Sequence, residues 1–271
     1  MVRQSLREDV GKGDITTRLT VEPGSRCRAA LRAKSDGVLS GMTPFRMVFD
    51  ILNAHLRAWE ARPDGTVFRP GDVLASFSAL SRATLTGERT ALNFVQHLSG
   101  VATHTARFVK AVEGLDVRIT DTRKTLPLFR DLEKEAVLHG GGTNHRRGLY
   151  DAILIKDNHI RAAGGIEEAL RRAKKVAGNG MKIEIEVTNL EECECALSIG
   201  ADIVMLDNMS LEDMATATQR RDGAHVLFEA SGNVTLDRVR RVAETGVDMI
   251  SVGALTHSAP AADLSLKIEE A

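Results

Sequence analysis

The chain has 271 residues, is 43% hydrophobic and carries a formal net charge of -1 at pH 7, which is enough apolar material for one large core or two smaller ones. Aromatic residues make up only 4% of it and there is no basic excess, so nucleic-acid binding gains no support. No stretch approaches the ~20 apolar residues of a membrane span, and the opening MVRQSLREDV lacks the apolar segment of a signal peptide, so we expect a cytoplasmic protein with no membrane contact.

Residues 1 to about 80 favour short strands joined by tight turns. Alternating apolar residues from Cys27 to Ala33 indicate a strand, and the spacing of apolar residues from Thr43 to Leu56 indicates a helix. The turn signals are Asp36-Gly37, Pro63-Asp64-Gly65 and Pro70-Gly71-Asp72. This part is therefore predicted to be a small α/β unit.

The next stretch, 81 to 112, has two successive helical patterns, and Ser99-Gly100 is expected to break them. The final residues, ADLSLKIEEA, alternate polar and apolar as a strand does, with Leu264, Leu266 and Ile268 on one face. We expect this last strand to rejoin the first domain.

Beyond residue 112, short apolar runs alternate with helical stretches such as 165–176 and 236–245. This alternation predicts parallel strands connected by helices. The six runs are 117–120, 152–155, 183–187, 202–206, 225–228 and 248–252.

Polar residues or glycines end every run, which favours a barrel, because an open doubly wound sheet would place them only beside its switch point. No G-x-G-x-x-G follows the first run. Six strands are too few for a full (β/α)8 barrel, so we expect an incomplete one. The predicted organisation is an α/β sandwich domain over 1–98, joined by a C-terminal strand in 259–271, and a (β/α) barrel domain over 99–258 with the active site at the carboxyl ends of its strands.

Several cations fall where predicted strands end. Arg123 and Lys124 follow the first run and Lys156 follows the second, with His145 and Arg146 between the two runs. At the carboxyl edge of a barrel, such a group is suited to an anionic ligand. The alternative is that these charges are solvated loop residues.

Two late loops offer small residues and free amides after the fifth and sixth runs. Gly232 and Gly253 have no Cβ, so backbone N–H groups can approach phosphate oxygens, with Ser231 and Asn233 beside them. Barrels commonly hold a phosphate at this place, although a simple tight turn would need the same residues.

The two acids Glu186 and Asp207 end neighbouring runs, so they are expected to face the same mouth. Such a pair can accept hydrogen bonds from sugar hydroxyls or hold Mg²⁺. The alternative is an internal salt bridge to Lys156 or Arg123.

At these residues the chain closely resembles one family, quinolinate phosphoribosyltransferase, also called nicotinate-nucleotide pyrophosphorylase (carboxylating). The resemblance covers nearly the whole chain, and its motifs are specific when taken together. They are EDVGKGDITT, GERTALNFVQHLSG, DTRKT, GGGTNHR, LIKDNHI, IEIEV, MLDN, EASGN and GVDMISVGALTHS.

The resemblance implies an enzyme of de novo NAD biosynthesis that joins quinolinate to phosphoribosyl pyrophosphate and releases nicotinate mononucleotide, pyrophosphate and CO₂. It implies Mg²⁺ and no organic cofactor. It also implies a homodimer with shared active sites, or a larger assembly such as a hexamer.

Site residues carry over position by position. The resemblance assigns Arg89, Arg123, His145, Arg146 and Lys156 to quinolinate, Lys124 to pyrophosphate, Glu186 and Asp207 to ribose and Mg²⁺, and Ser231, Gly232, Asn233 and Gly253 to the 5-phosphate. Lys124, Lys156, Glu186 and Asp207 are the predicted catalytic residues. The helical pattern alone predicts a solvated position for Arg89.

The chain departs from the family pattern after DTRKT. The family usually continues Thr-Pro-Gly-Leu-Arg, whereas residues 126–130 of this chain are LPLFR. Its short N-terminus also leaves a leading helix open. Three rival functions remain at this point: a Schiff-base aldolase using Lys156, the related protein encoded with molybdate transporters, and a phosphosugar-binding regulator.

Overall fold

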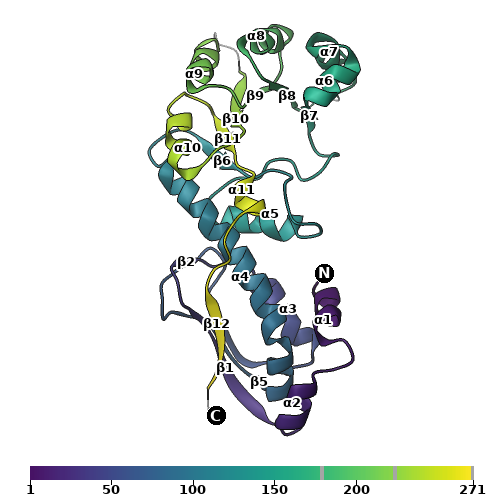
Figure 1. Cartoon of the computed structure of the whole chain (residues 1–271), viewed down its shortest axis with the longest axis vertical. Helices are drawn as coiled ribbons and strands as arrows, with labels where there is room; N and C mark the ends of the chain where they lie inside the picture. Colours follow the sequence, from purple (N-terminus) through teal and green to yellow (C-terminus); the bar gives the residue numbers. More distant parts are fainter. Residues whose placement is uncertain (178–179, 222–224, 270–271) are drawn as a thin grey trace. The chain divides into compact units, whose positions relative to one another are not determined.

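The computed structural model describes residues 1–177, 180–221 and 225–269, and the chain divides into two compact units (Figure 1). Unit 1 comprises residues 1–106, 126–141 and 258–271, and unit 2 comprises residues 107–125 and 142–257. No helix in the described ranges is long and apolar enough to cross a membrane.

Unit 1 is built on an antiparallel sheet in the order β12-β1-β5-β3, next to a small β2-β4 pair. The C-terminal strand β12 pairs with β1 from Leu264 opposite Ala33 to Glu269 opposite Arg28, so the end of the chain belongs to the sheet of unit 1. The last two residues of that predicted strand, 270 and 271, lie outside the described residues. The strands are β1 (Arg26–Ala33), β2 (Gly37–Val38), β3 (Arg57–Ala61), β4 (Val67–Phe68), β5 (Val73–Leu80) and β12 (Leu264–Glu269).

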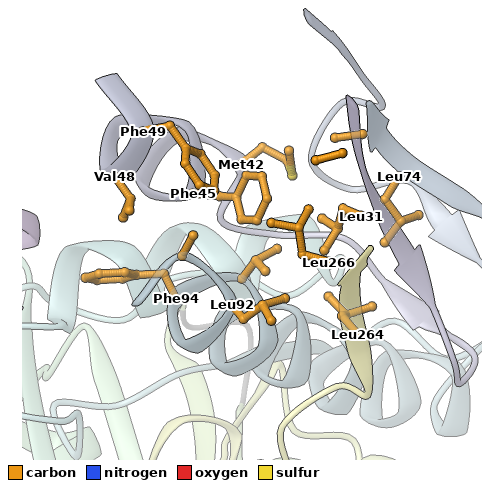
Figure 2. Close-up of a cluster of buried hydrophobic side chains, with 14 of the residues drawn as sticks. Leu31, Met42, Phe45, Val48, Phe49, Leu74, Leu92, Phe94, Leu264 and Leu266 are labelled. Carbon is orange, nitrogen blue, oxygen red and sulfur yellow. The ribbon is translucent and has the colours of Figure 1, made fainter. Parts of the chain in front are cut away.

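The core of unit 1 is apolar. Figure 2 shows side chains from α3, α4 and the strands pointing toward one another, among them Phe45, Leu31 and Leu266. Phe45 is fully buried and meets Phe49 edge to face, with ring centroids 5.3 Å apart. The helices of this unit are α1 (Val2–Val10), α2 (Ile15–Thr20), α3 (Met42–Ile51), the greater part of α4 (Ser81–Ala111) and α5 (Arg130–His139).

Two details of unit 1 differ from the sequence prediction. The opening residues form the short helices α1 and α2, where strands and turns were expected. The predicted break at Ser99-Gly100 is wrong, since α4 is a single helix. Ser99 hydrogen-bonds both the N–H and the C=O of Ser40, and a Cβ on Gly100 would come within 2.3 Å of the Pro260 carbonyl oxygen. The small residues therefore allow two other segments to approach the helix closely.

Unit 2 contains a parallel sheet in the order β6-β11-β10-β9-β8-β7, with helices following most of its strands. This arrangement confirms the predicted barrel-like α/β domain. The strands are β6 (Arg118–Thr120), β7 (Ile153–Ile155), β8 (Ile183–Val187), β9 (Ile203–Asp207), β10 (Leu227–Ser231) and β11 (Met249–Ser251). The helices are α6 (Asp157–Ala163), α7 (Ile166–Val176), α8 (Leu190–Ile199), α9 (Leu211–Gln219), α10 (Leu236–Ala243) and α11 (Ala254–His257).

Strand β8, Ile183–Val187, shows how the sheet presents polar groups to one side. Successive side chains of a strand point to opposite faces, so Glu184 and Glu186 share one face while the β-branched residues occupy the other. The whole strand is buried, which requires that the two carboxylates find partners inside the unit.

Candidate active site

A cavity of about 760 Å³ opens where the strands of unit 2 end. This volume falls in the range of small-molecule sites. Its lining includes most of the predicted site residues: Arg123, Lys124, His145, Arg146, Lys156, Glu186, Asp207, Ser231, Gly232, Asn233 and Gly253. The remaining predicted residue, Arg89, lies at an exposed position of α4 in unit 1.

The backbone of Lys124 is held from two sides. Its N–H donates to the hydroxyl of Thr122 at 3.0 Å, and its C=O accepts the hydroxyl of Thr256 at 2.7 Å. A Cβ on Gly253 would come within 2.9 Å of Lys124 Cδ and 3.2 Å of His257 Nε2. The absence of a side chain at Gly253 thus leaves room for Lys124 at the edge of the cavity.

Lys156 and Glu186 form an ion pair across neighbouring strands β7 and β8. Lys156 Nζ lies 2.6 Å from Glu186 Oε2, and Glu186 is nearly buried while Lys156 is half-exposed. The internal salt bridge left open by the sequence is therefore present, and it lies inside the cavity. One oxygen of Glu186 is used by this pair, so the other is the one available to a ligand.

Asp207 is connected to the predicted phosphate loop through Asn208. The Asn208 amide donates to Asp207 Oδ2 at 2.8 Å, and its carbonyl oxygen accepts from the Asn233 amide at 3.0 Å. Gly232 has a φ of 93°, and a Cβ there would lie 2.3 Å from Asn208 Oδ1. A residue with a side chain at Gly232 would be strained in backbone and in space, so this loop requires glycine.

The His145 ring contacts two buried acids. Its Nε2 lies 3.1 Å from Glu184 Oε2 and 3.5 Å from Glu229 Oε2, and both glutamates are almost fully buried. Asp121, also fully buried, accepts the backbone N–H of His145 at 2.8 Å. No role is predicted for Glu184 or Glu229 from the sequence, although side-chain alternation along a strand puts Glu184 on the same face as Glu186.

These contacts shift the proton equilibria of the cluster. Burial disfavours a charged His145 ring, but Glu184 and Glu229 outweigh burial and raise the pKa of His145 to about 10. Burial also raises the pKa of Glu184. A pKa near 10 would put protons on both ring nitrogens at neutral pH, yet the backbone N–H of Arg146 points at Nδ1 from 2.8 Å. Because a backbone amide can only donate, this contact places the ring proton on Nε2.

Arg146 presents one edge of its guanidinium without an acceptor. Its Nη1 donates to the Ala152 carbonyl at 3.2 Å, whereas its buried Nε has no hydrogen-bond partner among the described residues. Burial and the nearby Arg123 lower the pKa of Arg146. Nε and Nη2 form the side of the fork that matches a carboxylate, so this residue is suited to a planar acid.

Other residues of the cavity carried weaker signals in the sequence. Asn208 and Thr122 are adjacent to predicted site residues, and His257 belongs to the GALTHS motif. Glu229 opens the EASGN motif, and its side chain lines the cavity from β10. The contacts of Glu229 with His145 and of Asn208 with Asn233 join segments far apart in the sequence, so spacing along the chain could not reveal them.

The fold and this cavity define a class of α/β enzymes that bind anionic substrates at the carboxyl ends of parallel strands. Within that class, family models for the C-terminal and N-terminal domains of quinolinate phosphoribosyl transferase match residues 101–267 and 14–99. The chain belongs to the quinolinate phosphoribosyltransferase family.

Similar proteins cover almost the whole chain. Nicotinate-nucleotide pyrophosphorylase (carboxylating) of Mycobacterium leprae is 41% identical over 98% of this chain and 95% of its own length. The chloroplastic enzyme of the same name from Arabidopsis thaliana is 38% identical over 99% of this chain and 82% of its own. The solved structure of the nicotinate-nucleotide pyrophosphorylase from Francisella tularensis superposes with a TM-score of 0.93 at 42% identity, over 99% of this chain and 94% of that one.

Proposed function

We propose that the chain catalyses the transfer of a phosphoribosyl group from phosphoribosyl pyrophosphate to quinolinate, with loss of CO₂, to give nicotinate mononucleotide and pyrophosphate. The observation that carries this proposal is the cavity of unit 2, where cations, a phosphate-type loop and two strand-end acids meet. The family and the names of the similar proteins support the same reaction.

The quinolinate end of the cavity is assigned to Arg123, Arg146 and Lys156, with His145 at its base. Quinolinate carries two carboxylates on a flat ring, and the free Nε and Nη2 edge of Arg146 can bind one of them through two parallel hydrogen bonds. Lys156 adds a compact positive charge next to Glu186.

The phosphoribosyl end is assigned to the opposite set of residues. Ser231, Gly232, Asn233 and Gly253 offer backbone amides to the 5-phosphate, and α10 begins directly after Thr235, so its N-terminus favours negative charge. Lys124, held beside Gly253, is placed to neutralise the departing pyrophosphate.

Mg²⁺ fits the acids of this site by donor chemistry. Glu186 and Asp207 each keep one carboxylate oxygen that the Lys156 and Asn208 contacts do not use. Two such oxygens suffice, because Mg²⁺ usually retains waters and substrate phosphates in its shell. When bound, the ion would supply positive charge to the pyrophosphate group, and no organic cofactor is required.

The chemistry follows from these positions. Ribosyl transfer builds positive charge at the anomeric carbon, so the carboxylates of Glu186 and Asp207 stabilise the transition state while Lys124 stabilises the leaving group. After the ring nitrogen has become quaternary, its positive charge stabilises the electron pair that departing CO₂ leaves on the adjacent ring carbon, and a proton from water then takes the place of the carboxylate. The protein contributes to this step by positioning the substrate.

The last predicted site residue, Arg89, is assigned to the site of a second subunit. It lies in unit 1, at an exposed position of α4, and the family resemblance assigns it to quinolinate. We assign it to the cavity of a partner subunit, so that a twofold homodimer, or a hexamer built from such dimers, would contain shared sites.

The proposed location is the cytoplasm. Cys27, Cys193 and Cys195 are free thiols, and burial raises the pKa of Cys193 to about 11. Reduced, unreactive cysteines are compatible with a compartment that keeps thiols reduced. Cell fractionation with an antibody to the protein tests this assignment.

A Schiff-base aldolase is disfavoured by the Lys156–Glu186 ion pair. An aldolase lysine must be neutral to attack a carbonyl, and the carboxylate 2.6 Å away stabilises the ammonium form instead. Borohydride trapping with a phosphosugar aldehyde would label Lys156 only if that reading were correct.

The direct test incubates the protein with quinolinate, phosphoribosyl pyrophosphate and Mg²⁺ and measures nicotinate mononucleotide by chromatography and pyrophosphate by a coupled assay. We expect the two products in equal amounts. Folded protein that binds phosphoribosyl pyrophosphate without forming product would instead indicate a phosphosugar-binding regulator. Folded protein that gives neither binding nor product would favour the paralogue encoded with molybdate transporters.

A further inference from the structure

The segment that carries His145 and Arg146 has no helix or strand of its own to hold it in place. It is fastened instead to the end of β6. Thr143 N–H donates to the Ile119 carbonyl at 2.8 Å, and Asp121 accepts the Asn144 amide at 2.7 Å and the His145 N–H at 2.8 Å. A fully buried carboxylate therefore fixes the backbone of this segment from one side.

Two further buried carboxylates, on other strands of the sheet, approach the His145 ring. Glu184 on β8 and Glu229 on β10 both approach His145 Nε2, although β9 lies between their strands in the sheet. The His145 ring thus bridges strands that do not pair with each other. Because Nδ1 accepts the Arg146 N–H, both ring nitrogens are engaged by the protein in this conformation.

A metal site is the competing explanation, because the ligand atoms of His145, Glu184 and Glu229 lie within 4.8 Å of one another. The hydrogen-bond pattern argues against it. Nδ1 has its lone pair occupied by the Arg146 N–H, so the ring proton sits on Nε2, which then has no lone pair for an ion. The acids therefore face a proton donor.

We propose that Asp121, Glu184 and Glu229 are positioning residues for quinolinate binding: they clamp His145, and through it they set the backbone from which Arg146 reaches the cavity. This inference rests on the proposed function. In this view His145 acts by fixing Arg146, whose Nη1 is further oriented by the Ala152 carbonyl. The free Nε and Nη2 edge is then preorganised for one carboxylate of the substrate.

The variants Asp121→Asn, Glu184→Gln and Glu229→Gln keep the shape of each side chain while removing its negative charge. A matched control is Asp248→Asn. The Asp248 carboxylate pairs with Arg221 and accepts the Phe228 N–H. Asp248 directly precedes β11, at the end of the strands opposite the cavity. The melting temperature separates a general loss of stability from a loss of positioning.

Kinetics provide the first readout. We expect the KM for quinolinate to rise roughly tenfold or more in the three variants, with the KM for phosphoribosyl pyrophosphate unchanged within about twofold. The control should lower the melting temperature and leave both KM values unchanged. An unchanged quinolinate KM in folded variants, or an equal rise in both KM values, would overturn the proposal.

The second readout does not depend on turnover, so it separates this inference from the proposed function. Nitrogen-15 NMR of histidine-labelled protein, assigned with His145→Gln, should show a neutral ring in wild type with its proton on Nε2. Glu184→Gln and Glu229→Gln should shift the Nε2 signal, and Asp248→Asn should not. A proton on Nδ1, or binding of one equivalent of Zn²⁺ that Glu229→Gln abolishes, would overturn the proposal even in an inactive protein.

Discussion

Each unit of the molecule contains a fully buried glutamate near a histidine, and the carboxylates of these two glutamates differ in their hydrogen-bond partners. In unit 1, Glu133 is 2.7 Å from His97 Nε2 through one oxygen and accepts the Leu126 N–H through the other. In unit 2, Glu229 is 3.5 Å from His145 Nε2, and neither of its oxygens has a hydrogen bond among the described residues. Both oxygens of Glu133 therefore have partners within unit 1, whereas Glu229 lines a cavity.

This contrast extends to the interiors of the two units. Unit 1 is held by an apolar cluster of phenylalanine, leucine and alanine side chains. Unit 2 keeps three carboxylates buried around His145, those of Asp121, Glu184 and Glu229. Burying a carboxylate costs stability, and Glu229 has no hydrogen-bond partner among the described residues, so we attribute its presence to the chemistry of the cavity. Variants in the interior of unit 1 should therefore lose stability, whereas variants around the cavity of unit 2 should lose activity.

The largest expected effect is on stability, from Phe45→Ala in unit 1. Removing a fully buried aromatic side chain costs about 3–5 kcal/mol, which corresponds to a fall in melting temperature of roughly 6–20 °C. Both KM values should stay near those of the wild type at a temperature where the variant is folded. Met47→Ala, an exposed position of the same helix, is the control and should melt like the wild type.

Lys124→Ala should lower the turnover rate without lowering the melting temperature. We expect turnover to fall about 10²–10³-fold, as when one charge-stabilising group is removed, because pyrophosphate gains charge only as it leaves. The quinolinate KM and the melting temperature should change little. Lys110→Ala, at an exposed position of α4, serves as control. Unchanged turnover in Lys124→Ala would remove this residue from the leaving-group role.

Arg146→Lys tests whether geometry matters beyond charge. Lysine keeps the positive charge but cannot form the Nε and Nη2 fork, so the quinolinate KM should rise roughly 10–100-fold. Arg147→Lys, its exposed neighbour, should behave as the wild type. Equal rates for Arg146→Lys and wild type at low quinolinate concentration would show that charge alone is sufficient.

Gly253→Val is expected to have the smallest effect among the site variants. A branched side chain would crowd Lys124 and His257 and hinder the approach of phosphate to the backbone amides. The KM for phosphoribosyl pyrophosphate should rise roughly tenfold, and more than the KM for quinolinate. Equal losses for both substrates, measured together with a lowered melting temperature, would indicate misfolding.

The sequence predicted the parts of this molecule that depend on local pattern. Short apolar runs between helical stretches located the strands of unit 2, and the polar residues after them lie around one cavity. The single helix α4 was missed because the role of Gly100 depends on Pro260, far away in the sequence. Glu184 and Glu229 were missed for the same reason, since their partner His145 lies on another segment.

The central proposal is that unit 2 contains the reaction site and that unit 1 of a partner subunit contributes Arg89 to it. Arg89→Ala and Lys156→Ala should each be nearly inactive as pure proteins. In an equal mixture with free subunit exchange, half of the dimers are mixed, and each mixed dimer has one intact site, so about one quarter of wild-type activity should return.

The most direct measurement is therefore the activity of this mixture, with subunit exchange verified by native mass spectrometry. A mixture of Lys156→Ala with Asp207→Asn is the matched control and should stay inactive, because both defects fall in unit 2 and no site is intact. Recovery of about one quarter of the activity by the Arg89→Ala and Lys156→Ala mixture alone is the predicted result. Exchange without recovery would contradict the shared site and place the function of Arg89, if it has one, within its own subunit.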